Sequence, residues 1–170
     1  MRIKVEKILS SGIQVEVTPQ LEWAVDVARS VLEAELESLA GELDIQREGS
    51  RIQVRGQVVA SANRVCERCG ETTRLELGGE VDLVYLPEKF EDSGSTEVRL
   101  EQRDLDVGWY SEGVLDMGAA LSEALALTLP PRIQCADVPG CDDRVSAMLS
   151  AANQPDEGAL SPFAVLGRLN

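Results

Sequence analysis

The 170-residue sequence contains no histidine, the side chain most often used for proton transfer near neutral pH. An acid–base enzyme would therefore depend on carboxylates, and no spacing of aspartate and glutamate in this chain singles out a pair. Without histidine, a metal site must use cysteine or carboxylate ligands. We therefore expect a protein that is not an enzyme.

Aromatic residues are scarce, at 4% of the chain, so the core must consist mainly of Val, Leu, Ile and Ala. No apolar run approaches the roughly eighteen residues of a membrane-spanning helix. The first seven residues alternate charged and aliphatic side chains, unlike a signal peptide. These absences predict a cytoplasmic protein with no membrane partner, and no motif for a small-molecule substrate is present. In that compartment, paired cysteines are more often metal ligands than disulfides.

Positively charged residues are also few, because the chain has 16 Lys and Arg but 30 Asp and Glu. Its net charge is −14. A negative field opposes the approach of a polyphosphate, so any contact with RNA must come from a local basic patch. A basic protein partner is an equally natural interpretation. The acidity could also serve solubility alone.

The chain has four cysteines, and they form two close pairs, Cys66 with Cys69 and Cys135 with Cys141. Four soft thiolates suit a tetrahedral zinc ion and leave no open position for substrate, so such a site would be structural. The first pair joins two strand-like runs, which favours a zinc knuckle over a redox site at the start of a helix. Reduced thiols without metal, or a disulfide or redox use of the first pair, are the alternatives.

Basic residues concentrate in one region, residues 47–74, which holds six arginines against three glutamates. Within it, Arg51 and Arg55 fall on the strand face opposite Ile52 and Val54, and are expected to point to solvent together. The candidate residues for binding nucleic acid or another partner are Arg51, Arg55, Arg64 and Arg68. The alternative is that these arginines only decorate the solvated side of a sheet.

The length suits one α+β domain, and alternating residues predict an antiparallel β-meander, either open or barrel-like, packed with two main helices. The expected strands lie in 1–18, 43–46, 51–60, 73–77, 81–85 and 105–110. Gly78-Gly79, between two of these strands, predicts a bulge or a tight bend.

Helical spacing of apolar residues predicts the first main helix over 20–40, with Gly41 ending it. The second is expected over 117–128, capped by Asp116 and stopped by Pro130. An irregular loop carrying the second cysteine pair would follow, and then a short helix over 142–154.

The predicted domain covers residues 1–152 and includes an exposed acidic loop at 87–102. Residues 153–170 are expected to form a polar linker and a C-terminal apolar helix that starts near Ser161-Pro162. That helix would dock on its own domain or bind a partner, because an exposed apolar face is costly. No sequence pattern indicates the oligomeric state.

Several short motifs occur in a fixed order along the chain. Val65-Cys66-Glu67-Arg68-Cys69 precedes a strand, Tyr85-Leu86-Pro87 closes a strand pair, and an acidic loop follows. Leu115-Asp116 then leads into a helix that ends before Pro130, and Ser-Pro-Phe-Ala-Val-Leu lies near the end. Together these motifs resemble the bacterial and plastid large ribosomal RNA subunit accumulation family, also called the YceD family.

The resemblance implies a cytoplasmic, non-enzymatic factor in ribosome biogenesis, needed for large-subunit ribosomal RNA to accumulate. Its partner would be ribosomal RNA or a basic ribosomal or assembly protein. The motif carries over Cys66 and Cys69, and with them Cys135 and Cys141. The alternative function is an acidic protein–protein interaction module with a structural zinc site and no role with RNA.

Overall fold

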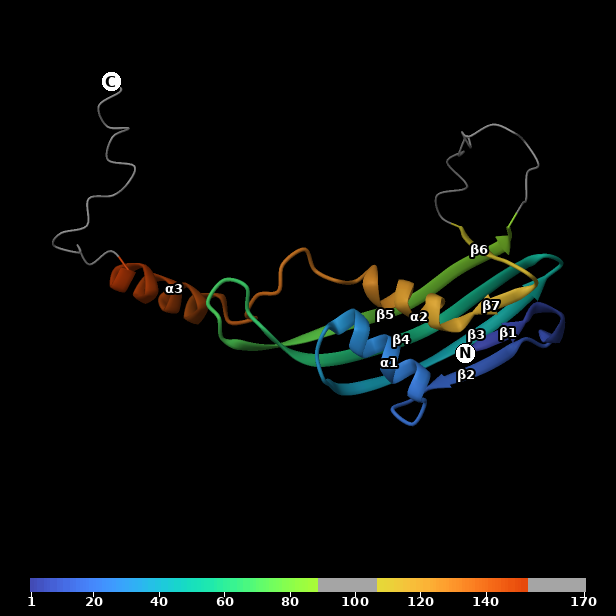
Figure 1. The fold of residues 1–170 in the computed structure, drawn as a ribbon, viewed down its shortest axis with the longest axis horizontal. Helices are drawn as coiled ribbons and strands as arrows, with labels where there is room; N and C mark the ends of the chain where they lie inside the picture. Colours follow the sequence, from blue (N-terminus) through green and yellow to red (C-terminus); the bar gives the residue numbers. More distant parts are fainter. Residues whose placement is uncertain (89–106, 153–170) are drawn as a thin grey trace, which may run out of the picture.

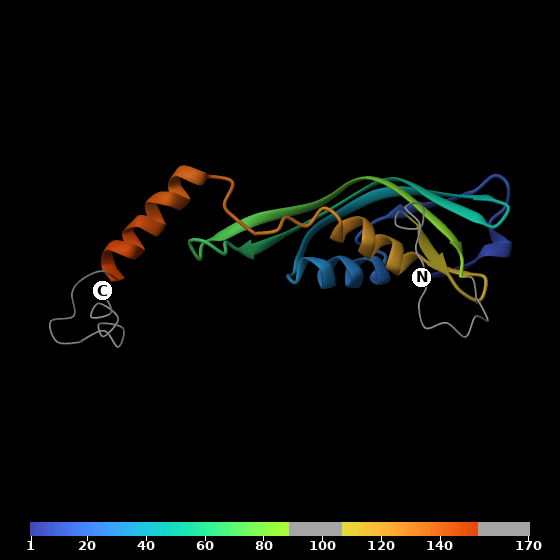
Figure 2. The same ribbon diagram turned by 90° about the horizontal axis from the view of Figure 1, so that it is seen from above.

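The computed structural model of the protein describes residues 1–88 and 107–152. A five-stranded sheet runs in the order β2-β3-β4-β5-β6, and β1 pairs separately with β7. Helices α1 and α2 lie on the same face of the large sheet (Figures 1 and 2), which confirms the predicted α+β class. The elements are β1 (Arg2–Lys4), η1 (Val5–Lys7), β2 (Ile13–Val17), α1 (Glu22–Leu32), β3 (Leu36–Glu48), β4 (Arg51–Val65), β5 (Thr72–Pro87), β6 (Gly108–Tyr110), β7 (Val114–Asp116), α2 (Met117–Ala126) and α3 (Val138–Ala152).

The centre of the sheet is the predicted antiparallel meander of β3, β4 and β5, which pair along most of their length. β2 adds to it antiparallel to β3, and β6 pairs in parallel with the end of β5. In the described part of the chain β2 and β6 do not pair with each other, so the barrel-like form is wrong. These edge strands span only 5 and 3 residues, too few to close the sheet on itself.

The inner face of the sheet carries the hydrophobic core, as the alternation in β4 predicts. Ile52, Val54 and Val58 are fully buried, because α1 and α2 cover this face. Two small residues of α1, Ala24 and Ala28, are fully buried in this core. The outer face of the sheet, opposite the helices, carries polar and charged side chains.

The predicted extent of the first helix is wrong, because α1 ends at Leu32 rather than near Gly41. Glu33 adopts a left-handed conformation at φ 50°, and β3 begins at Leu36. Gly41 lies inside β3, paired with Val17 on one side and Val58 on the other. Helical spacing and strand alternation both fit this stretch, and pairing with β2 and β4 decides between them.

Gly78 and Gly79 lie within one continuous strand, β5, so the two predicted runs on either side of them belong together. The register of β5 with β4 is unbroken there, which excludes the predicted bulge. Gly78 has φ +109° and Gly56, on β4, has φ +149°, conformations that side chains rarely allow. We attribute the curvature of the sheet over the helices to these positions (Figure 2).

Asp116 caps α2 as predicted. Its Oδ1 accepts hydrogen bonds from the backbone N–H of Gly118, at 2.8 Å, and of Ala119, at 3.4 Å. Partial burial acts to raise the pKa of this carboxyl, but these donors and Arg2 outweigh it, and the pKa lies below its usual value. The helix ends at Ala126, two residues before the predicted end.

The third helix differs more from its prediction, because α3 begins at Val138 and therefore includes Cys141. The strand expected in 105–110 is present as β6. Most of the predicted acidic loop, and the whole predicted C-terminal linker and helix, lie outside the described residues. Among the residues that the structure describes, no helix combines the length and the apolar character needed to cross a membrane.

Candidate metal centre

The first cysteine pair lies in the turn between β4 and β5, at the end of the sheet farthest from β6 (Figure 1). The Cys66 N–H donates to the carbonyl of Glu71 at 2.8 Å, and the Gly70 N–H donates to the carbonyl of Cys66 at 2.9 Å. Gly70 itself has φ +78°. These contacts build the predicted knuckle, in which a strand-to-strand turn presents two thiols.

The second cysteine pair comes from the segment that follows α2. Cys135 lies in the connection between α2 and α3, and Cys141 lies in the first turns of α3, not in a loop as predicted. The Glu67 N–H donates to the carbonyl of Ile133 at 2.8 Å, which fixes this connection to the knuckle. The Asp137 carboxylate accepts from the Gly140 N–H at 3.2 Å at the start of α3. The structure thus brings the two pairs together across 65 residues, as the sequence predicts.

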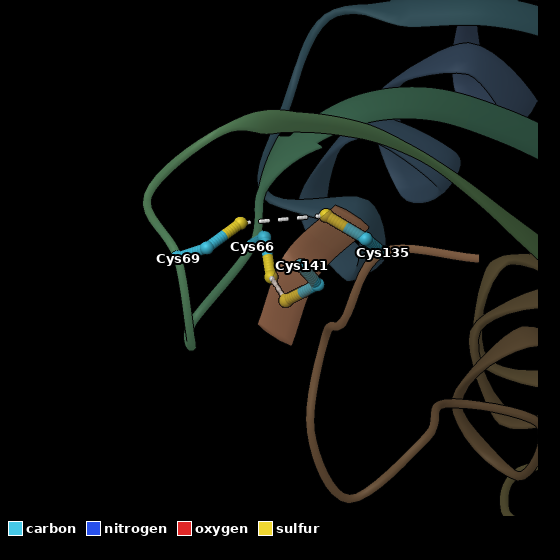
Figure 3. Close-up of side chains that lie close together, drawn as sticks. All are labelled: Cys66, Cys69, Cys135 and Cys141. Atoms are coloured by element: carbon cyan, nitrogen blue, oxygen red, sulfur yellow. Dashed lines mark hydrogen bonds between the residues drawn. The ribbon is translucent and has the colours of Figure 1, made fainter. Parts of the chain in front are cut away.

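The four sulfur atoms form a compact group, all within 4.8 Å of one another (Figure 3). The sulfurs of Cys66 and Cys141 are 3.9 Å apart, and those of Cys69 and Cys135 are 3.5 Å apart. Both distances are too long for a disulfide. In a tetrahedral site with zinc–sulfur bonds of about 2.3 Å, neighbouring sulfurs are about 3.8 Å apart. The arrangement therefore fits a single ion held by four thiolates.

Burial separates this group from solvent. Cys66, Cys69 and Cys141 are each at most 2% exposed, while Cys135 is partly exposed. Val145 of α3 packs against them, and together they form a cluster distinct from the main core. Four ligands in so closed a site would leave no coordination position for substrate, which is typical of a structural metal.

The pKa values of the four thiols are shifted in different directions. The backbone N–H of Cys69 is the main cause that lowers the pKa of Cys66, to about 6. The backbone N–H of Glu71 and the guanidinium of Arg144 lower the pKa of Cys69. The Cys69 sulfur raises the pKa of Cys135, and burial raises that of Cys141 to about 12. Two lowered and two raised pKa values are the pattern expected when adjacent negative charges repel, and a dication would favour ionisation of all four.

Arg144 belongs to this site and was not found from the sequence. Its Nη2 donates to the Cys135 sulfur at 3.4 Å, and the nearby Cys69 and Cys135 sulfurs raise the pKa of the guanidinium. The usable signal was its spacing, because residues three apart on a helix share a face and Cys141 precedes it by three. That signal requires knowing that both lie in one helix.

The four candidate binding arginines do not form one patch. Arg51 and Arg55 are exposed on the outer face of the sheet, and the Nε of Arg55 lies 3.4 Å from the Asp82 carboxylate. Arg64 reaches the end of α1, where it donates to the Leu32 carbonyl and pairs with Glu33. Arg68, in the knuckle, pairs with Asp142 of α3. Arg51 alone of the four has no hydrogen-bond or ion-pair partner among the described residues.

The outer face of the sheet is predominantly acidic. Carboxylates from three strands, β2, β3 and β5, point outward there, namely Glu16, Glu42, Asp44, Glu80 and Asp82. A shallow hollow of about 870 Å³ lies over β2, β3 and β4, with Gln14, Glu16, Glu42, Asp44 and Gln57 in its lining. Arg55 lies between Asp44 and Asp82 in the strand register, so its charge is locally offset.

The sequence matches the family model for large ribosomal RNA subunit accumulation protein YceD over residues 54–170. The matched region begins within β4 and contains all four cysteines. No curated protein matches the chain. No solved structure matches it either. The match covers well over half of the chain and confirms the predicted resemblance, so this protein belongs to the YceD family, whose name points to the accumulation of large-subunit ribosomal RNA.

Proposed function

We propose that this protein is a non-enzymatic cytoplasmic factor in ribosome biogenesis that supports the accumulation of large-subunit ribosomal RNA. The observation that carries the proposal is the family match over residues 54–170. A structural role for the cysteine site is consistent with it, because a closed four-thiolate shell offers no position for catalysis.

We further propose that Cys66, Cys69, Cys135 and Cys141 bind one structural zinc ion. The compact arrangement of the four sulfurs, within 4.8 Å of one another, supports this assignment. Soft thiolate ligands in tetrahedral geometry favour zinc over the hard cations magnesium and calcium. When bound, the ion would join the β4–β5 turn to the start of α3.

The charge distribution favours a basic ribosomal or assembly protein as the direct partner. The outer sheet face presents the carboxylates named above and the hollow, whereas three of the four candidate arginines are engaged with groups of the chain itself. An acidic face attracts Lys-rich and Arg-rich surfaces and repels phosphate. Arg51 and Arg55 remain the residues for the competing proposal of direct RNA contact.

Deletion of the gene is expected to lower the ratio of large- to small-subunit ribosomal RNA, measured by electrophoresis of total RNA. Wild-type protein should restore the ratio. If a basic protein binds the outer face, the triple variant E42Q/D44N/E80Q should fail to restore it, since the side-chain shapes are kept and the charges are lost. The R51Q/R55Q variant should restore it. An unchanged ratio after deletion would contradict the proposed function and favour an interaction module without an RNA role.

The two partner proposals give opposite results in the same assay. Failure of R51Q/R55Q together with success of the acidic triple variant would indicate direct RNA contact through the arginines. Equal amounts of each variant in the cell, measured by immunoblotting, are the necessary control. A single substitution on the helix-covered side of the chain, E22Q at the start of α1, tests whether loss of a negative charge away from the outer face has any effect.

A further inference from the structure

The side chain of Arg144 is in an unusual position for a cation. It lies beside the cysteine cluster, with its Nη2 3.4 Å from the Cys135 sulfur. Its Nε is buried and has no hydrogen-bond partner among the described residues. Burying part of a guanidinium is costly unless a negative charge offsets it. The acceptor in contact with it is the Cys135 sulfur, so the charge of the thiolates in the proposed centre supplies that offset.

The helix explains why the residue is there. Arg144 follows Cys141 by three positions in α3, so both side chains leave the same face of the helix and reach the cluster together. Val145 packs on the cluster from the next position. The helix α3 therefore places the candidate ligand Cys141, the cation Arg144 and the apolar side chain of Val145 together at the cluster.

The negative charge of the proposed site explains why the Arg144 guanidinium lies beside it. A dication with four thiolates carries a net charge of −2, and three of the four cysteines are at most 2% exposed. A guanidinium in contact with the Cys135 sulfur reduces this to −1. Its planar, rigid set of donors holds that sulfur in a fixed direction, which the rotating ammonium of a lysine does less well.

We propose that Arg144 is a positioning residue of the metal centre: it holds the sulfur of Cys135 and offsets part of the charge of the four thiolates. The inference rests on the proposed zinc site and adds a fifth residue to it. Cys135 is the most exposed of the four cysteines, so its orientation depends most on such a contact. Hydrogen bonds from outside the ligand shell commonly change metal affinity by about 10- to 100-fold.

The test compares three variants of the full-length protein. R144M keeps most of the side-chain stem but removes the charge and the donors, and R144K keeps the charge. R132M is the control, because it removes one positive charge from an exposed residue in the connection between α2 and α3. Zinc affinity is measured by competition with a chromophoric chelator. R144M is expected to bind zinc at least about 10-fold more weakly, R144K to recover part of the loss, and R132M to match wild type.

Cobalt(II) provides a readout that a purely structural role would not change. Hydrogen bonds stabilise the sulfur lone pairs, so their loss in R144M should move the sulfur-to-cobalt charge-transfer band to lower energy. Wild-type affinity and an unshifted band in R144M would overturn the proposal, as would an equal loss in R132M. If wild type binds neither zinc nor cobalt, the metal centre itself fails. Circular dichroism verifies folding, and R144K provides the test if R144M does not fold.

Discussion

Removal of the metal is expected to release α3 while the sheet, α1 and α2 stay folded. α3 projects beyond the end of the sheet and makes few contacts with the other elements (Figures 1 and 2). Its described contacts gather at the cysteine cluster and at the pair of Asp142 with Arg68. The main core of the sheet is a separate cluster that contains no cysteine. A helix of 15 residues without tertiary partners is marginal in water.

Hydrogen exchange followed by mass spectrometry measures this result peptide by peptide. After chelation of zinc under reducing conditions, amides in 138–152 should exchange at least about 10-fold faster, and those in the middle of β4 should be nearly unchanged. C141S should show the same pattern without chelation, whereas S146A, on an exposed position of the same helix, should not. If the amides of α3 stay protected after chelation, the metal does not hold α3 to the β4–β5 turn as proposed. Loss of protection throughout the sheet would also contradict the proposal.

Gly56→Ala is expected to destabilise the whole sheet by about 3 kcal/mol or more. Gly56 has φ +149°, and a Cβ added to its backbone would lie 1.9 Å from the carbonyl oxygen of Glu42. The obstacle is the backbone of the neighbouring strand, which cannot move without breaking pairing between β3 and β4. The unfolding free energy from urea titration measures the effect.

Gly49→Ala is the matched control, because it separates the cost of the backbone conformation from the cost of the clash. Gly49 has φ +63°, in the turn between β3 and β4, and an added Cβ would have no heavy atom within 4 Å. Alanine there should cost about 1 kcal/mol, the usual penalty for a left-handed residue. If both variants lose the same free energy of unfolding, the clash with the neighbouring strand at Gly56 does not contribute to the destabilisation.

Much of this architecture was accessible from local patterns. The alternation of Ile52, Val54 and Val58 predicts the buried face of β4, and Asp116 marks the start of α2. The pairing of Cys66 and Cys69 with Cys135 and Cys141 in space also followed from the sequence, because thiols spaced for metal binding indicate a common centre.

The errors arose where distant contacts decide between locally acceptable structures. Leu36 and Leu39 fit a helical stripe, yet pairing of β3 with β4 places them in a strand. The start of α3 does have a sequence signal, since Asp137 and Pro139 are favourable at a helix N-terminus. Arg64 and Arg68 look like a basic surface in the sequence, but their partners Glu33 and Asp142 come from elsewhere in the chain.

The metal content of the native protein tests the four-thiolate centre most directly. Native mass spectrometry of protein purified under reducing conditions should give one zinc ion per chain, and C66S should have lost it. Denaturing mass spectrometry of the same sample should find four free thiols and no disulfide. A wild-type protein that stays metal-free when zinc is supplied, or one that carries a Cys66–Cys69 disulfide, would contradict the centre proposed here.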